Sequence, residues 1–98
     1  MSMVKNLNYN YAFVFYDVNE ARVNKVFKVC KKYLTHFQYS VFRGEITPSK
    51  LIQLRTDLNK VIEPEEDFIC IIKLMNSYVF GEEVLGKGNK NIDNELIL

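Results

Sequence analysis

A continuous apolar run over residues 11–16, of sequence YAFVFY, is the feature that most constrains how this 98-residue chain can fold. Its side chains are mostly aromatic or β-branched, which is typical of a strand covered on both faces. The run stops at Asp17, where Asn19 offers a helix N-cap and Glu20 lies in the first turn. The chain is therefore expected to pass from a buried strand almost directly into a helix.

Residues 20–35 have a helical periodicity with one apolar face and one basic face. The apolar face is expected to pack on a core and consists of Val23, Val26, Phe27, Cys30 and Leu34. The opposite face has Arg22 at its border and carries Lys25, Lys28, Lys31 and Lys32. This pattern predicts an amphipathic helix with a cationic outer side.

A second strand and a second helix follow. Residues 37–43 alternate as a strand does, and the extended character continues beyond Gly44. The stretch is either one bent strand or two short strands around a kink, and Gly44 is a candidate bulge. Thr47 as N-cap and Pro48 at the first helical position predict the start of the second helix, which ends before Pro64.

Two further strands are predicted, a strong one over residues 68–75 and another over 78–85. The order strand, helix, strand, helix, strand places both helices on one face of a sheet. We therefore expect an α+β fold, the ferredoxin-like βαββαβ sandwich. One domain is expected over residues 1–98, with its core at 9–85 and a linker and short apolar strand at 86–98.

Composition excludes several other classes of protein. A hydrophobic content of 48% with two Pro and four Gly excludes a disordered or collagen-like chain. No apolar run approaches the roughly 20 residues that a membrane-spanning helix needs, and no signal peptide is expected. Cys30 and Cys70 lie in apolar stretches without a CxxC pattern, so they are expected to be reduced core residues of a cytoplasmic protein.

The net charge of +1 hides an uneven distribution of charge. Residues 21–44 contain six Lys or Arg and His36, but no acidic residue. These basic side chains form either a solvated helix face or a surface that contacts phosphate groups. The absence of acidic residues from this stretch favours contact with phosphate. The basic candidates for binding nucleic acid are Arg22, Lys25, Lys28, Lys32 and Arg43. Tyr16, Tyr39 and Phe42 are able to stack on bases, although such residues in strands are more often part of a core.

Asp17 lies where a buried strand ends and a helix begins, a place where polar function is often found. It is either a turn residue or a ligand of Mg²⁺, with Mn²⁺ as an alternative metal. Mg²⁺ is often held by one or two carboxylates, with waters and substrate phosphate completing its shell. No second acid is obviously placed near Asp17, but a symmetric dimer would supply one across its two-fold axis.

Two segments together resemble the family of the small CRISPR-associated adaptation protein, "CRISPR-associated protein two". They are YAFVFYDV at residues 11–18, followed by Arg22, and QYSVFRGE at residues 38–45. The resemblance covers roughly residues 11–98. It implies a ferredoxin-like homodimer in which the C-terminal strand packs on the partner's sheet, through Glu95, Leu96, Ile97 and Leu98.

The resemblance also implies a site and partners. Asp17 of each protomer would face the other around Mg²⁺ as the catalytic and metal-binding residue. Tyr16, Arg22 and Phe42 match family positions, whereas His36 stands where relatives often have Arg or Lys. Members act as metal-dependent endonucleases on single-stranded RNA or duplex DNA. They also bridge two integrase dimers during spacer acquisition.

Two other functions stay open. The dimer is alternatively an architectural brace that binds duplex DNA while the integrase subunit does the chemistry, because no side chain is a convincing general base. A small-molecule regulatory domain of ferredoxin-like fold is a further alternative without positive support in the sequence.

Overall fold

The computed structural model describes residues 8–86 of the chain. Their elements follow the order strand, helix, strand, strand, helix, strand, which confirms the predicted βαββαβ arrangement and the α+β class. The bounds are β1 Tyr11–Asp17, α2 Val23–Tyr33, β2 Thr35–Gln38, β3 Val41–Glu45, α3 Pro48–Val61 and β4 Phe68–Leu74. No helix of this described part is long and apolar enough to cross a membrane.

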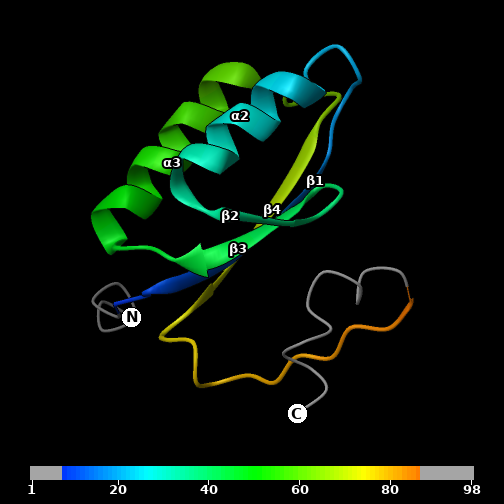
Figure 1. Ribbon diagram of the computed structural model, residues 1–98. Helices are drawn as coiled ribbons and strands as arrows, with labels where there is room; N and C mark the ends of the chain where they lie inside the picture. Colours follow the sequence, from blue (N-terminus) through cyan, green and yellow to red (C-terminus); the bar gives the residue numbers. More distant parts are fainter. Residues whose placement is uncertain (1–7, 87–98) are drawn as a thin grey trace.

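The four strands form one antiparallel sheet in the order β2-β3-β1-β4. Both helices lie on the same face of this sheet, side by side, and no helix of residues 8–86 lies over the opposite face (Figure 1). The strand β1 is central, pairing with β3 on one side and with β4 on the other. Its carboxyl end therefore lies at the middle of one end of the sheet.

The core lies between the sheet and the helices. On β1, every second side chain from Ala12 to Tyr16 is buried beneath the helices. The residues that are at most 3% exposed are Ala12, Val14, Val26, Cys30, Phe42, Leu54 and Leu58. The predicted apolar face of α2 needs one correction, because Val29 is buried whereas Val23 is 37% exposed.

The second helix starts as predicted and the first does not. Thr47 is the N-cap of α3, its hydroxyl accepts a hydrogen bond from the Lys50 backbone N–H at 3.2 Å, and Pro48 follows at the first position. The expected N-cap of α2 at Asn19 is wrong, since the helix begins at Val23. The Asn19 side chain instead accepts a hydrogen bond from the Ala21 N–H at 2.8 Å and forms an Asx turn.

Two strand predictions are also resolved. The extended stretch after α2 is two strands, β2 and β3, joined by a turn at Tyr39 and Ser40, and the register irregularity lies in β2 rather than at Gly44. The strand expected over 78–85 is absent from the described residues. There the chain turns away from the sheet after β4 (Figure 1). The Phe80 ring packs on Tyr11 and Phe13, and the segment does not enter the sheet.

We predict that Leu54→Ala lowers the free energy of unfolding by about 2–5 kcal/mol, because it leaves a cavity under α3. Leu54 is 0% exposed, whereas Ile52 on the same helix is 55% exposed. Ile52→Ala is the matched control and should change stability by no more than about 0.5 kcal/mol. Urea denaturation followed by circular dichroism measures both values. Equal effects of the two substitutions would contradict the described core.

Candidate metal and nucleic-acid site

The strand β1 brings Asp17 to the face of the sheet without helices. Side chains alternate between the two faces of a strand. Because Ala12, Val14 and Tyr16 are buried towards the helices, Phe15 and Asp17 belong to the open face. Asp17 is exposed and lies opposite Phe68 of β4 in the register. Its carboxylate therefore lies at one end of the sheet, on the face opposite the two helices.

The open face next to Asp17 is apolar. Phe15 is 36% exposed, Phe68 57% and Ile72 44%, and the register places all three on the same face. The far part of this face is covered by Phe80, whose ring centroid lies 5.2 Å from that of Phe13. A contiguous apolar surface thus adjoins the carboxylate of Asp17, and such surfaces on small proteins mark sites of association.

Arg22 and Asp67 form an ion pair at the same end of the molecule. Arg22 donates from Nε to Asp67 Oδ2 at 2.5 Å and from Nη2 to Oδ1 at 3.1 Å, a bidentate arrangement. Asp67 also accepts hydrogen bonds from the Asn19 and Glu63 backbone N–H groups, both at 2.8 Å. Arg22 reaches Glu66 Oε1 as well, at 2.7 Å. This arrangement joins the start of α2 to the loop that precedes β4.

The ion pair changes the role expected for Arg22. Its hydrogen bonds with Asp67 and Glu66 raise the pKa of Arg22 above its ordinary value. The same bond from Arg22 is the main cause that holds the pKa of Asp67 well below its ordinary value. Arg22 was predicted to bind nucleic acid, but in this structure its guanidinium is engaged by two carboxylates. Asp67 was not predicted as the partner of Arg22, although acids cluster at residues 63–67.

The aromatic candidates Tyr16 and Phe42 lie in the core. Tyr16 is 6% exposed and Phe42 0%, and their rings stack with centroids 6.4 Å apart. Burial is the main cause that raises the pKa of the Tyr16 hydroxyl, with Cys30 adding to it. Stacking of these two rings on nucleic-acid bases is therefore not supported, because the helices cover them.

The basic candidates are divided between two sides of the sheet. Lys25, Lys28 and Lys32 are exposed on α2, as predicted for the outer helix face. Arg43 instead belongs to the open face, where its guanidinium lies 4.1 Å from the centre of the Phe37 ring and donates a hydrogen bond to Glu82. The predicted basic set is thus not one continuous surface with Asp17.

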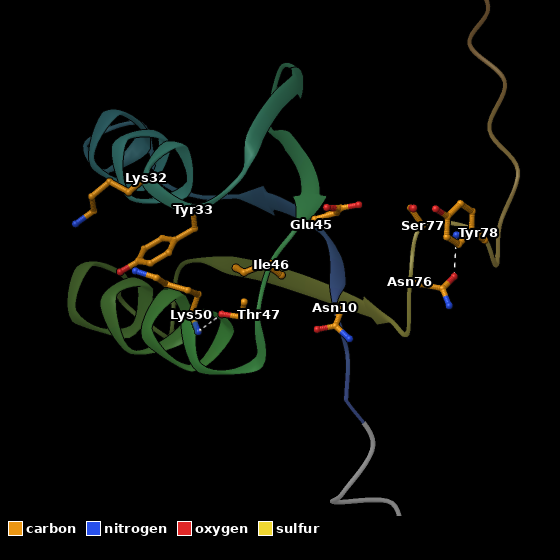
Figure 2. A pocket seen from close by; sticks show the side chains of 10 residues that line it. All are labelled: Asn10, Lys32, Tyr33, Glu45, Ile46, Thr47, Lys50, Asn76, Ser77 and Tyr78. Carbon is orange, nitrogen blue, oxygen red and sulfur yellow. Dashed lines mark hydrogen bonds between the residues drawn. The ribbon is translucent and has the colours of Figure 1, made fainter.

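A cavity of about 510 Å³ lies at the other end of the sheet from Asp17. Figure 2 shows Lys32 and Tyr33 of α2 together with Thr47 and Lys50 at the start of α3. The Tyr33 hydroxyl donates to Asp57 Oδ2 at 2.6 Å, and this bond is the main cause that lowers the pKa of Asp57. Lys32 lies 3.6 Å from the same carboxylate. Lys50 adds a cation here that the sequence analysis did not select.

His36 lies in β2 and packs its ring against Phe27 and Phe42, with centroids 4.9 and 5.0 Å away. Its Nε2 is 2.8 Å from the carbonyl oxygen of Tyr39. The ring thereby supports the turn between β2 and β3. Its predicted supporting role towards nucleic acid remains a prediction.

The donor set near Asp17 in one chain is small. Within residues 8–86, no group of three or more His, Cys, Asp or Glu side chains is arranged to hold a metal ion. Asp67, at the same end, is engaged by Arg22 and two backbone N–H groups. One exposed carboxylate fits Mg²⁺ when a second carboxylate, waters and phosphate oxygens complete an octahedron. Asp17 alone therefore offers one carboxylate ligand, and a magnesium site here would need a second carboxylate from elsewhere.

The two cysteines do not take part in this site. Both are free cysteines, Cys30 buried and Cys70 half-buried. Burial raises the pKa of the Cys30 thiol to about 12, which makes it unreactive. The predicted dimer residues, Glu95, Leu96, Ile97 and Leu98, lie outside the described residues.

An antiparallel α+β sandwich with an acidic strand end beside an open sheet defines a small ferredoxin-like protein, and comparisons identify its family. Residues 10–80 match the model of the family "CRISPR associated protein Cas2". The chain belongs to the Cas2 family. It is 46% identical over 76 residues to the CRISPR-associated endoribonuclease Cas2 3 of Thermodesulfovibrio yellowstonii, covering 78% of this chain and 86% of that protein.

Further relatives agree with this assignment. The CRISPR-associated endoribonuclease Cas2 of Thermotoga maritima is 38% identical over 76 residues, which cover 78% of this chain and 87% of that protein. A solved structure described as "Crystal structure of cas2" is similar with a TM-score of 0.75 and 37% identity, covering 81% of this chain and 88% of the other. Cas2 of Streptococcus pyogenes at pH 6.5 gives a TM-score of 0.58 at 26% identity, with coverages of 84% and 93%.

We predict that Asp67→Asn destabilises the fold at about pH 7. The carboxylate accepts hydrogen bonds from Arg22 and from two backbone N–H groups, and in the variant an amide NH₂, itself a donor, would face some of these donors. The folded-state pKa of Asp67 lies below the ordinary value of 3.8. The stabilisation is therefore complete above about pH 4 and is lost as the pH falls through the folded-state pKa. The difference in Tm between wild type and Asp67→Asn should narrow from about pH 7 to about pH 3.

The control for this measurement is Glu65→Gln, an exposed neighbour in the same loop. Its effect on Tm at about pH 7 should be small. Thermal denaturation by circular dichroism gives all the values. A difference between wild type and Asp67→Asn that is the same at both pH values would contradict the ion pair.

Proposed function

We propose that this chain is a CRISPR adaptation protein that works as a homodimer, hydrolysing phosphodiester bonds with two Asp17 side chains across the two-fold axis. The observation that carries this proposal is the exposed Asp17 at the end of an apolar sheet face without helices. Its curated relatives are named CRISPR-associated endoribonucleases. That name supports a nuclease activity on RNA.

The occupant proposed for the open face is a second copy of this chain. Phe15, Phe68 and Ile72 are exposed there although the helix side is well packed. Two identical apolar faces related by a two-fold axis are self-complementary, which is the commonest way that small proteins form dimers. A two-fold axis that runs along the strands would place both Asp17 carboxylates at the same end of the interface, facing each other.

The C-terminal residues 95–98 are proposed to pack on the partner's sheet. The strand β4 is an edge strand, since it pairs only with β1 within the described sheet. A cavity of about 450 Å³ adjoins it, with apolar walls that include Leu58, Ile62, Ile69 and Ile71. An unpaired strand edge is a template for another strand. The apolar sequence ELIL provides a segment of suitable character.

The proposed cofactor is Mg²⁺, or Mn²⁺ in its place, between the two Asp17 carboxylates. When bound, it supplies a Lewis acid for the phosphate and lowers the pKa of an attacking water. The two carboxylates would hold the ion at the dimer axis. No general base is assigned.

Nucleic acid is proposed to contact the exposed lysines of α2 through its phosphates, above all Lys25, Lys28 and Lys32. Duplex DNA is the proposed partner for the role in spacer acquisition, and single-stranded RNA is the proposed substrate for hydrolysis. The integrase subunit of the same system is the proposed protein partner, which the dimer would bridge.

The architectural brace is the second candidate function. It is favoured by the separation of the basic residues from Asp17, since the α2 lysines lie on the helix side and Asp17 on the open side of the sheet. A brace needs the lysines for binding but does not need Asp17. The nuclease would lose cleavage when Asp17 is replaced, whereas the brace would keep its function without Asp17 and lose binding when the lysines are replaced.

We predict that Asp17→Asn reduces Mg²⁺-dependent cleavage of single-stranded RNA by at least about 100-fold, because the metal loses two charged ligands. Affinity for a short duplex should stay within about twofold, since phosphate contacts dominate it. Cleavage assays with Mg²⁺ and with EDTA, together with filter binding, measure both quantities.

The double variant Lys25→Gln, Lys28→Gln is the matched comparison. It should bind the duplex more weakly, and its affinity should depend less on salt concentration, because it makes fewer phosphate contacts. If wild type and Asp17→Asn bind equally and neither cleaves with Mg²⁺, the nuclease proposal is wrong and the brace is supported.

We predict that Ile72→Asp converts the dimer into a monomer, because a carboxylate in the middle of the apolar interface would be buried without a partner. Ile52→Asp is the control, since Ile52 is similarly exposed but lies on α3. Sedimentation velocity measures the mass of each variant. The proposed interface would be ruled out by an Ile72→Asp protein that is folded and as dimeric as the control.

A further inference from the structure

The turn between β2 and β3 contains an aromatic side chain that the fold does not explain. Tyr39 is 79% exposed, so it contributes little to the core. Its φ is 42°, and it is the only residue other than glycine with positive φ among the described residues 8–86. It is also the first residue of a two-residue hairpin loop, since Gln38 pairs with Val41. Glycine adopts such a conformation without steric cost, whereas a tyrosine is strained there.

Neighbouring groups hold Tyr39 in this conformation. The Nε2 of His36 is 2.8 Å from the Tyr39 carbonyl oxygen, and His36 itself is packed between Phe27 and Phe42. The Tyr16 backbone N–H donates to the Ser40 carbonyl at 3.1 Å. Contacts at the carbonyl groups of Tyr39 and Ser40 thus fix the backbone of the turn, and the Tyr39 ring remains exposed to solvent. Strained residues persist where the surroundings over-determine them, and they cluster at functional sites.

The turn lies beside Asp17. The β1–β3 register runs from Tyr11 opposite Glu45 to Phe15 opposite Val41, and the bond between Tyr16 and Ser40 extends it by one pair. Asp17 follows Tyr16 in the chain, and Tyr39 precedes Ser40. Asp17 and Tyr39 are therefore the two residues next to the hydrogen bond between Tyr16 and Ser40. The exposed ring and the proposed metal ligand therefore share one end of the sheet.

We infer that Tyr39 is a stacking platform for an unpaired base of single-stranded RNA whose phosphate lies at Asp17. This inference rests on the proposed function, because it names a further residue for binding the same substrate. An exposed aromatic ring presents its face to a base, and such stacking tolerates any base sequence. Tyr39 is a positioning residue in this account, since it holds the strand next to the reacting phosphate.

An unpaired strand fits the exposed ring better than a duplex does. The faces of bases in a duplex are covered by their neighbours in the stack, whereas splayed bases of single-stranded RNA commonly stack on aromatic side chains. The inference therefore predicts that Tyr39 discriminates between the two forms. The α2 lysines, which contact phosphate in the proposed function, should not discriminate in this way.

The test compares Tyr39→Gly and Tyr39→Phe with wild type. Glycine suits the positive φ, so Tyr39→Gly should fold with an equal or higher Tm while it removes the ring. Tyr78→Gly is the control, because Tyr78 is 89% exposed but lines the cavity at the other end of the sheet. The probe is a short single-stranded RNA that carries one 2-aminopurine, with EDTA present so that it stays uncleaved.

Wild type, Tyr39→Phe and Tyr78→Gly should quench the 2-aminopurine fluorescence and bind this RNA alike. Tyr39→Gly should lose the quenching and bind it roughly 5- to 150-fold more weakly, which is the usual range for loss of one stacked base. Its affinity for the same sequence as a duplex should not change.

Two results would overturn the inference alone. Either Tyr39→Gly binds and quenches as wild type does, or it weakens RNA and duplex binding by the same factor. In both cases wild type still binds nucleic acid, so the proposed function stands. Failure of wild type to bind either nucleic acid would instead overturn the proposed function, and this inference with it.

Discussion

The two helices cover one side of the four-stranded sheet, and the other properties of the molecule depend on this one-sided packing. The alternation along β1 sends Ala12, Val14 and Tyr16 into the helix-covered core, and the same alternation sends Phe15 and Asp17 to the opposite face. A sheet that is apolar on both faces needs a second covering layer, and within residues 8–86 the Phe80 ring covers part of the open side. The proposed dimer would supply that layer and would pair the two carboxylates in one step.

The ion pair between Arg22 and Asp67 fixes the end of the sheet where Asp17 lies. It ties the start of α2 to the loop before β4, and Asp67 has hydrogen bonds to both sides of that junction. A buried carboxylate needs such partners, because an unpaired charge away from water is costly. The pair therefore has a structural role, and the Arg22 guanidinium is engaged by two carboxylates.

The element order, the Thr47–Pro48 helix start and the position of Asp17 were predictable, because periodicity, capping residues and a polar strand end are local signals. The partner of Arg22 was not, since Asp67 is 45 residues away in the chain and only the fold brings the two together. The same limit explains the strand wrongly expected over 78–85, where apolar alternation says nothing about whether a neighbouring strand is available. Tyr16, Tyr39 and Phe42 were all predicted to be able to stack on bases, and the family resemblance favoured Tyr16 and Phe42. The fold separates them, burying two rings and exposing the third.

The pairing of two Asp17 side chains across a dimer axis is the central claim of this account. It is tested most directly by counting Mn²⁺ ions bound per chain, using electron paramagnetic resonance of Mn²⁺ titrated into the wild-type protein and into Asp17→Asn. The account predicts one specifically bound ion for two chains, absent from Asp17→Asn. One ion per chain, or binding that Asp17→Asn leaves unchanged, would contradict it.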